Sequence, residues 1–223
     1  MGQAIGDLLP SAVGVAFSPI PIIAVILMLG TPRGRTNGPA FAIGWVLGLI
    51  VVSTVIVLLA GDSDDSDSGS STAVDVIKLL FGALFLLLAI KQWKSRPKAG
   101  EEAEMPTWMS TIDSFTAAKS FGLGALLSSI NPKNLALTFA AAAAIAQAGL
   151  SGGESAISIA VFVIIGSITV AGPVIYYLLA PNSAGLLGEI KQFMSEHNAV
   201  IMFVLFMVLG AKLIGGGIAG LAD

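Results

Sequence analysis

The most regular feature of the chain is a series of six long apolar stretches separated by polar connections. At about 1.5 Å per residue, a helix made from each stretch would cross about 30 Å of hydrocarbon. The stretches are continuously apolar and do not alternate with period two, so they favour helices over a transmembrane barrel. The pattern predicts an all-α polytopic membrane protein with six transmembrane helices, at residues 8–29, 41–60, 73–93, 120–148, 155–180 and 198–221.

Two proline motifs lie at corresponding places in the two halves of the chain. The first apolar stretch contains AFSPIPIIAVIL and the fourth contains SSINPKNLALTF, so that Pro19 and Pro132 are separated by about half of the 223 residues. Because three is an odd number, two halves of three helices must enter the membrane from opposite sides. The sequence therefore predicts two inverted three-helix repeats, 1–93 and 119–223, joined by a cytoplasmic linker, 94–118.

The linker changes character along its length, from the polar RPKAGEEAE to the more apolar MPTWMSTIDSFTAAK. Its apolar residues have the spacing of one face of a short helix, which predicts an amphipathic helix along the cytoplasmic interface. The same face could instead dock a partner, and both interpretations stay open. The serine- and aspartate-rich run at residues 62–71 is expected to be a disordered loop. The apolar face of the linker consists of Trp108, Met109, Ile112 and Phe115.

The charges of the connections predict an orientation in the membrane. Acidic or neutral connections, residues 61–71 and 148–155, alternate with basic ones. Basic connections are usually cytoplasmic, so we expect a plasma-membrane protein with both termini extracytoplasmic. Lys78 and Lys212 are the basic residues near span ends on the predicted outer side. The residues of the basic connections are Arg33, Arg35, Lys91, Lys94, Arg96, Lys98, Lys119 and Lys191.

The two proline motifs also predict a binding site in the middle of the membrane. Ser18 and Asn131 are good N-caps, and the prolines that follow them are favoured at the first position of a helix. Both motifs should therefore start new helices at similar depth, with unpaired N–H groups that favour an anionic group such as a carboxylate, sulfate or phosphate. The predicted substrate-binding residues are Ser18, Pro19, Pro21, Asn131, Pro132, Lys133 and Asn134, together with Lys212 on the exit path.

Structural explanations of the same residues remain open at this point. Prolines kink membrane helices without binding anything, and a lysine side chain can reach an interface when its helix is tilted. Lys212 either extends outward in this way or helps to receive an anion as it leaves. Gly44 and Gly48, and the GGGIAG run at 215–220, fit close helix packing within the chain, although they would also permit a homodimer.

Composition supports the membrane assignment and narrows the chemistry. Hydrophobic residues make up 55% of the chain and charged residues 11%, and the mean hydropathy is +0.90. The N-terminus lacks the basic region of a cleavable signal, so the first stretch should stay as a span. The absence of cysteine excludes disulfides. No carboxylate lies deep in a span, which disfavours proton or metal coupling. Without a phosphate-binding loop, metal cluster or nucleophile triad, we expect neither an enzyme nor a cofactor.

The SPIP motif at 18–21, the NPKNLAL phrase from residue 131 and the AKLIGGG ending resemble a known family. The chain is similar to the GAP family of peptidoglycolipid-addressing and sulfolipid-addressing proteins, in the LysE-type exporter superfamily. The resemblance implies that an acidic glycolipid moves across the plasma membrane towards the cell envelope of mycobacteria and related actinobacteria. It also implies a large RND-type lipid transporter as partner, and no nucleic acid.

The resemblance transfers to the predicted site residue by residue. It falls on Asn131, Pro132, Lys133 and Asn134, and less fully on the first motif, which has no lysine matching Lys133. Three functions follow as hypotheses. The chain exports or addresses an anionic lipid, exports small solutes such as amino acids in the manner of LysE, or serves as a non-transporting subunit of a larger lipid-export complex.

Overall fold

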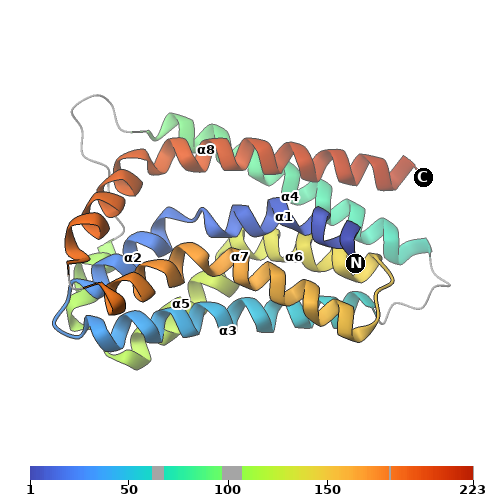
Figure 1. Ribbon diagram of the computed structural model, residues 1–223. Coiled ribbons are helices and arrows are strands. Elements are labelled where there is room, and N and C mark those ends of the chain that lie inside the picture. Colours follow the sequence, from blue (N-terminus) through green and yellow to red (C-terminus); the bar gives the residue numbers. More distant parts are fainter. Residues whose placement is uncertain (62–67, 97–106, 181, 223) are drawn as a thin grey trace.

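The computed structural model describes residues 1–61, 68–96, 107–180 and 182–222, and all regular structure in these ranges is helical (Figure 1). The predicted all-α class is therefore confirmed. The N- and C-termini lie at the same end of the molecule. The helices are α1 (Gly2–Ala16), α2 (Pro19–Leu29), α3 (Gly34–Gly61), α4 (Ser68–Lys94), the 3₁₀ helix η1 (Thr107–Ser114), α5 (Ala117–Ser129), α6 (Pro132–Gln147), α7 (Gly152–Leu179) and α8 (Ala184–Ala222).

Four of the described helices, α3, α4, α7 and α8, are long and apolar enough to cross a membrane. The first predicted span is divided into α1 and α2, which meet at a 50° bend and together give a fifth candidate. The predicted stretch 120–148 is divided between α5, with 13 residues, and α6, with 16. Each of these two helices is shorter than the roughly 20 residues that a straight span needs. The chain is thus a membrane protein with four or five candidate spans.

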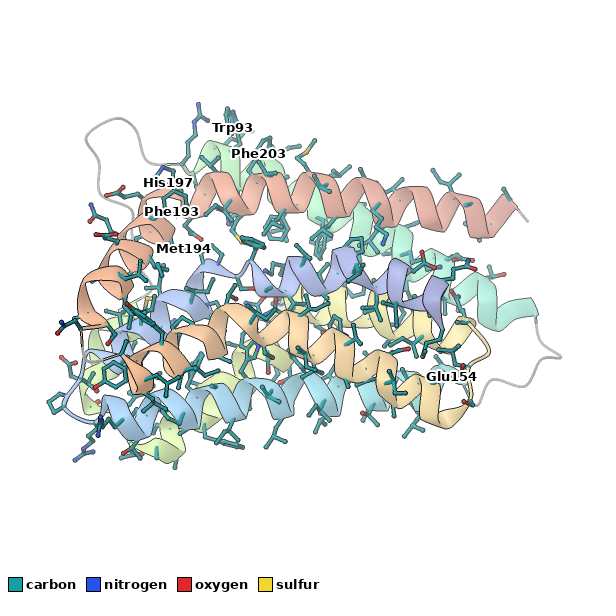
Figure 2. All side chains as sticks on the ribbon, in the orientation of Figure 1. Trp93, Glu154, Phe193, Met194, His197 and Phe203 are labelled. Carbon is teal, nitrogen blue, oxygen red and sulfur yellow. The ribbon has the colours of Figure 1, made fainter. Side chains whose placement is uncertain are left out.

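α4 and α8 pack against each other along one side of the molecule (Figure 1). Gly82 and Gly210 lie opposite each other in this pair, and each approaches the carbonyl oxygen of the other closely. Aromatic rings continue the seam, with Trp93 and Phe203 at a centroid distance of 4.9 Å (Figure 2). Small residues permit close backbone approach where lipid supplies no hydrophobic driving force between helices. This pair contacts the other helices mainly through α2, α1 and α6.

A second glycine seam joins α3 to α5. Side chains added at Gly44 and Gly48 would overlap Phe121, Ala125 or Ser128 of α5, so both glycines face α5. This placement confirms the prediction that the glycine pair serves packing within the chain. In the GGGIAG run, Gly217 and Gly220 lie against α4, whereas Gly215 and Gly216 have no such neighbour within 4 Å.

The apolar face of the linker packs on the protein itself. Met109 and Ile112 of η1 are buried, and η1 contacts α2. Asn37 Nδ2 also donates a hydrogen bond to the carbonyl oxygen of Phe115 at 2.9 Å. The predicted short helix is present as a 3₁₀ helix, and its contact with the membrane interface stays a prediction. Residues 62–67 and the polar piece at 97–106 lie outside the described ranges. The prediction of a disordered loop over residues 62–71 is wrong for its last part, because α4 already begins at Ser68.

Candidate functional site

The first break in the predicted site separates α1 from α2. Ser18 has extended backbone angles, φ −111° and ψ 96°, and Pro19 occupies the first turn of α2. The hydroxyl of Ser18 donates to the carbonyl oxygen of Val15 at 2.6 Å and makes no capping bond to α2. The expectation that this hydroxyl caps α2 is therefore wrong. The physical reason is that a capping hydroxyl accepts a hydrogen bond from a backbone N–H of the first helical turn. Pro19 and Pro21 carry no N–H, so this turn offers few donors to the Ser18 hydroxyl.

The second break separates α5 from α6 and follows the prediction closely. Asn131 is the N-cap of α6, and its Oδ1 accepts a hydrogen bond from the backbone N–H of Lys133 at 3.0 Å. The carbonyl oxygen of Asn131 accepts the first helical bond, from Leu135 at 2.8 Å. Pro132 fills the first helical position, where its missing N–H leaves no donor unpaired. The predicted helix start at this motif is confirmed.

Lys133 reaches from the first turn of α6 to the end of α1. Its side chain is buried, and its Nζ donates to the carbonyl oxygen of Gly14 at 2.8 Å and to that of Phe17 at 3.3 Å. A third bond joins Nζ to the hydroxyl of Ser18 at 2.5 Å. An ammonium has three donors, so every one has an acceptor. The carboxyl-terminal end of a helix carries partial negative charge, which favours a cation at this place.

Asn134 ties the second break to the first. It is fully buried, and its Nδ2 donates to the carbonyl oxygen of Leu127 in the last turn of α5 at 2.9 Å. Its Oδ1 lies 3.3 Å from the hydroxyl oxygen of Ser18. Two consecutive residues of α6 therefore hold two different helix ends, because Lys133 binds the end of α1 and Asn134 the end of α5.

The structure brings the two predicted motifs together but satisfies their polar groups internally. Ser18, Lys133 and Asn134 form one hydrogen-bonded cluster, which we call the break cluster. Pro19 and Pro21 are buried beside it, Asn131 is half-buried, and Pro132 is exposed. The expected row of unpaired N–H groups is shortened at both helix starts, because Pro19, Pro21 and Pro132 carry no N–H and Asn131 caps that of Lys133. Binding of a substrate by these residues stays a prediction.

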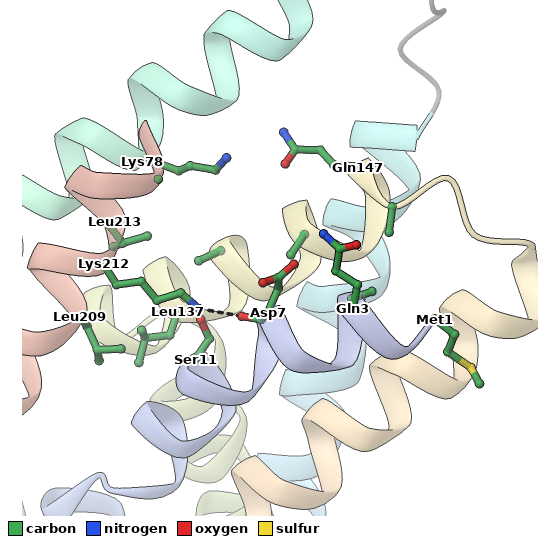
Figure 3. Close-up of a pocket in the computed structure, with 15 residues that line it drawn as sticks. Met1, Gln3, Asp7, Ser11, Lys78, Leu137, Gln147, Leu209, Lys212 and Leu213 are labelled. Carbon is green, nitrogen blue, oxygen red and sulfur yellow. Dashed lines mark hydrogen bonds between the residues drawn. The ribbon is translucent and has the colours of Figure 1, made fainter. Parts of the chain in front are cut away.

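A pocket of about 580 Å³ lies between α1, α4, α6 and α8 (Figure 3). Its lining combines polar side chains from all four helices with apolar side chains that come mostly from α6 and α8. Figure 3 shows Lys78 and Gln147 extending towards each other from opposite sides of the pocket. The polar lining residues are Gln3, Asp7, Ser11, Lys78, Gln147 and Lys212, and the larger apolar ones are Leu137, Leu209 and Leu213.

Lys212 lines this pocket, separate from the break cluster with which the sequence grouped it. Its Nζ donates to the backbone carbonyl oxygen of Asp7 at 2.8 Å. On the opposite wall, Lys78 forms an ion pair with the buried carboxylate of Asp75 at 2.7 Å. The sequence interpretation missed Asp7, Lys78 and Gln147 as site candidates. One signal was available, because Lys78 and Lys212 were the basic residues that departed from the charge pattern of the connections.

A pair of leucines separates the pocket from the break cluster. Leu137 and Leu209 both line the pocket. A Cβ added at Gly14 would lie 2.9 Å from a methyl of Leu137 and 2.8 Å from a methyl of Leu209, so both leucines rest on Gly14. The carbonyl oxygen of the same Gly14 accepts from Lys133. The pocket and the buried lysine are therefore neighbours with an apolar layer between them.

Comparison with known protein families identifies one that covers this chain. The family model described as "Sap, sulfolipid-1-addressing protein" matches residues 8–219, which is nearly the whole chain. No curated protein and no solved structure matches it. Among the described residues, no group of three or more His, Cys, Asp or Glu side chains could hold a metal ion.

Proposed function

Because the chain belongs to the sulfolipid-1-addressing protein family, we propose that it exports or addresses an anionic glycolipid, such as a sulfolipid, across the plasma membrane towards the cell envelope. The observation that carries the proposal is the break cluster, where a buried ammonium joins two interrupted helices. Ionisable residues inside a membrane usually mark a substrate path. No enzymatic step or cofactor is part of the proposal.

The contacts of Lys133 supply a mechanism for coupling binding to movement. Hydrogen bonds from an ammonium to an anionic oxygen are stronger than those to a neutral carbonyl. A sulfate or carboxylate that reaches Lys133 would therefore replace the carbonyl oxygens of Gly14 and Phe17. That exchange releases the end of α1 from α6. The anion then shifts the balance between two arrangements of these helices, as alternating access requires.

Helix packing supports six spans arranged as two inverted repeats, as in LysE-type exporters. In that arrangement α1 with α2 corresponds to α5 with α6, α3 to α7, and α4 to α8. Corresponding helices in such a repeat meet at the symmetry axis. Contacts between α1 and α6, between α3 and α7, and between α4 and α8 are consistent with this relation. The two breaks would then lie on the axis, where such transporters bind their substrates.

The predicted orientation can be tested with single cysteines, because the chain contains none. Gly152 begins α7 and has open space around it, and Ser114 ends η1 and is exposed. We expect Gly152→Cys to react with a membrane-impermeant maleimide in intact cells. Ser114→Cys should react only after the cells are permeabilised, because basic connections flank its side of the membrane. The reverse pattern would place the termini in the cytoplasm.

Purified protein in lipid vesicles tests the proposed function against its two alternatives. We expect a labelled acidic glycolipid to move between leaflets faster in vesicles with the protein than in empty ones. The small volume of the pocket favours the first alternative, a LysE-like exporter of small solutes. Such an exporter would move a labelled amino acid in the same vesicles and would not move the glycolipid.

The internally satisfied bonds of Lys133 favour the other alternative, a non-transporting subunit. Such a subunit would move neither the glycolipid nor the amino acid. Its deletion would instead disrupt assembly of an RND-type lipid transporter. A homodimer is compatible with each of the three functions, and the oligomeric state can be measured on the same purified material.

A further inference from the structure

The pocket between α1, α4, α6 and α8 has the size and the two-part lining of a ligand site. Its volume of about 580 Å³ lies within the roughly 300–1,000 Å³ of small-molecule sites. Polar side chains from all four helices line it together with apolar side chains that come mostly from α6 and α8 (Figure 3). A lining of this kind suits an amphiphile, whose polar head and hydrocarbon part need different surroundings.

Each of the two lysines that line the pocket lies close to an acidic residue. Lys78 is paired with Asp75 at 2.7 Å. Lys212 donates to the neutral backbone carbonyl of Asp7, and the carboxylate of Asp7 also lines the pocket. Two lysines are thus matched by two carboxylates. A simple anion gains little electrostatic stabilisation here, because its attraction to the lysines is offset by repulsion from Asp7 and Asp75.

The hydrogen-bonding groups at the opening include both donors and acceptors. A lysine only donates, a carboxylate only accepts, and the amides of Gln3 and Gln147 do both. A hydroxyl group both donates and accepts, so a head with several hydroxyls can use all of these groups. We infer that the pocket binds the polyhydroxyl, sugar-like head of an amphiphile, at a site separate from Lys133. This second site goes beyond the proposed function, because binding there can be measured whether or not lipid is moved.

The apolar wall fits the rest of such a ligand. Leu137, Ala140 and Ala144 are spaced three or four residues apart, so they share one face of α6. The two alanines leave room that larger side chains would fill. Leu209 and Leu213 present a similar face of α8. A sugar ring can place its C–H groups on this wall, as can an alkyl chain, while its hydroxyls meet the polar opening.

Protection of a single cysteine tests the inference. Ala144→Cys places a unique thiol in the pocket wall, since the natural chain has no cysteine. The protein, held in lipid nanodiscs, is treated with a maleimide in the presence of octyl glucoside below its micelle concentration. We expect octyl glucoside to slow modification of Ala144→Cys. Gly152→Cys, which lies outside the pocket, is the matched control and should react at an unchanged rate.

Two further substitutions identify the polar contacts. Asp7→Ala removes the carboxylate but keeps the backbone carbonyl that Lys212 uses, and Gln147→Ala removes the amide from the opposite side. Each should raise the octyl glucoside concentration for half-protection, by about tenfold for Asp7→Ala because a hydrogen bond to a charged group is lost. Lys94→Gln, at the other end of α4, should leave protection unchanged.

The head group is tested with octyl sulfate, which has the same alkyl chain and an anionic head without hydroxyls. We expect octyl sulfate to protect Ala144→Cys much less than octyl glucoside does. Equal or stronger protection by octyl sulfate would overturn the sugar-like head. An unprotected thiol with octyl glucoside would overturn the site itself, even if the vesicles still move glycolipid. Protection without any lipid movement would support the site and contradict the proposed function alone.

Discussion

Replacing Lys133 with alanine is expected to abolish glycolipid movement and to lower the stability of the protein. The substitution leaves the carbonyl oxygens of Gly14 and Phe17 and the hydroxyl of Ser18 without their shared donor. A buried polar group left without its partner costs about 1–3 kcal/mol. The contact between the start of α6 and the end of α1 is lost as well. Thermal unfolding of the purified protein and lipid transfer in vesicles measure the two effects.

A glutamine at the same position separates the structural from the electrostatic role of Lys133. Lys133→Gln keeps a donor but removes the charge, so it should be more stable than Lys133→Ala and still fail to move lipid. Lys119→Ala, which removes an exposed lysine from the start of α5, is the matched control and should behave as wild type. Wild-type lipid movement by Lys133→Gln would contradict the proposal that Lys133 binds an anion.

Replacing Gly44 with alanine is expected to destabilise the packing of α3 on α5. A Cβ at Gly44 would overlap the carbonyl oxygen of Phe121, which belongs to the backbone of α5 and cannot rotate away. Gly124 of α5 lies equally close to the carbonyl oxygen of Phe41 in α3. To accommodate a larger residue at Gly44, the helices would therefore have to separate at both contacts. Overpacking of this kind costs about 1–3 kcal/mol, and a valine at the same position should cost more. The midpoint of thermal unfolding in detergent measures the loss.

Gly122 provides the control for this substitution. It lies on α5 like Gly124, but a Cβ added there meets nothing within 4 Å. Gly122→Ala should therefore leave the unfolding midpoint unchanged or raise it slightly, because alanine favours the helix by up to about 1 kcal/mol. Equal midpoints for Gly44→Ala and the wild type would show that α3 and α5 do not pack at the described distance.

The two helix breaks could be predicted from the sequence because their causes are local. Proline lacks an N–H, and Asn131 has a side chain suited to cap the helix that follows. The meeting of the two breaks followed from the similar depth of both motifs. The direction of the Lys133 side chain could not be predicted in this way. Its partners Gly14 and Phe17 belong to another helix, more than a hundred residues away, and only tertiary packing brings them within reach.

The pocket and the contacts of the linker could not be predicted from the sequence. Asp7, Lys78 and Gln147 come from three different helices, and no local spacing relates them. In the linker, the face containing Met109 and Ile112 was recognised as apolar, but its partner α2 could not be deduced. An apolar face indicates that something will cover it and does not say whether that is lipid, another protein or the same chain.

The two prolines at the start of α2 help a membrane that contains this protein to remain impermeable to ions. A bend inside hydrocarbon frees backbone donors, which then need a side chain, a neighbouring helix or ordered water as partner. Pro19 and Pro21 remove two of those donors from the first turn of α2, and the 50° bend thus needs less hydration. The two prolines therefore leave fewer donors to attract water, which helps to preserve the electrical insulation of the bilayer around the bend.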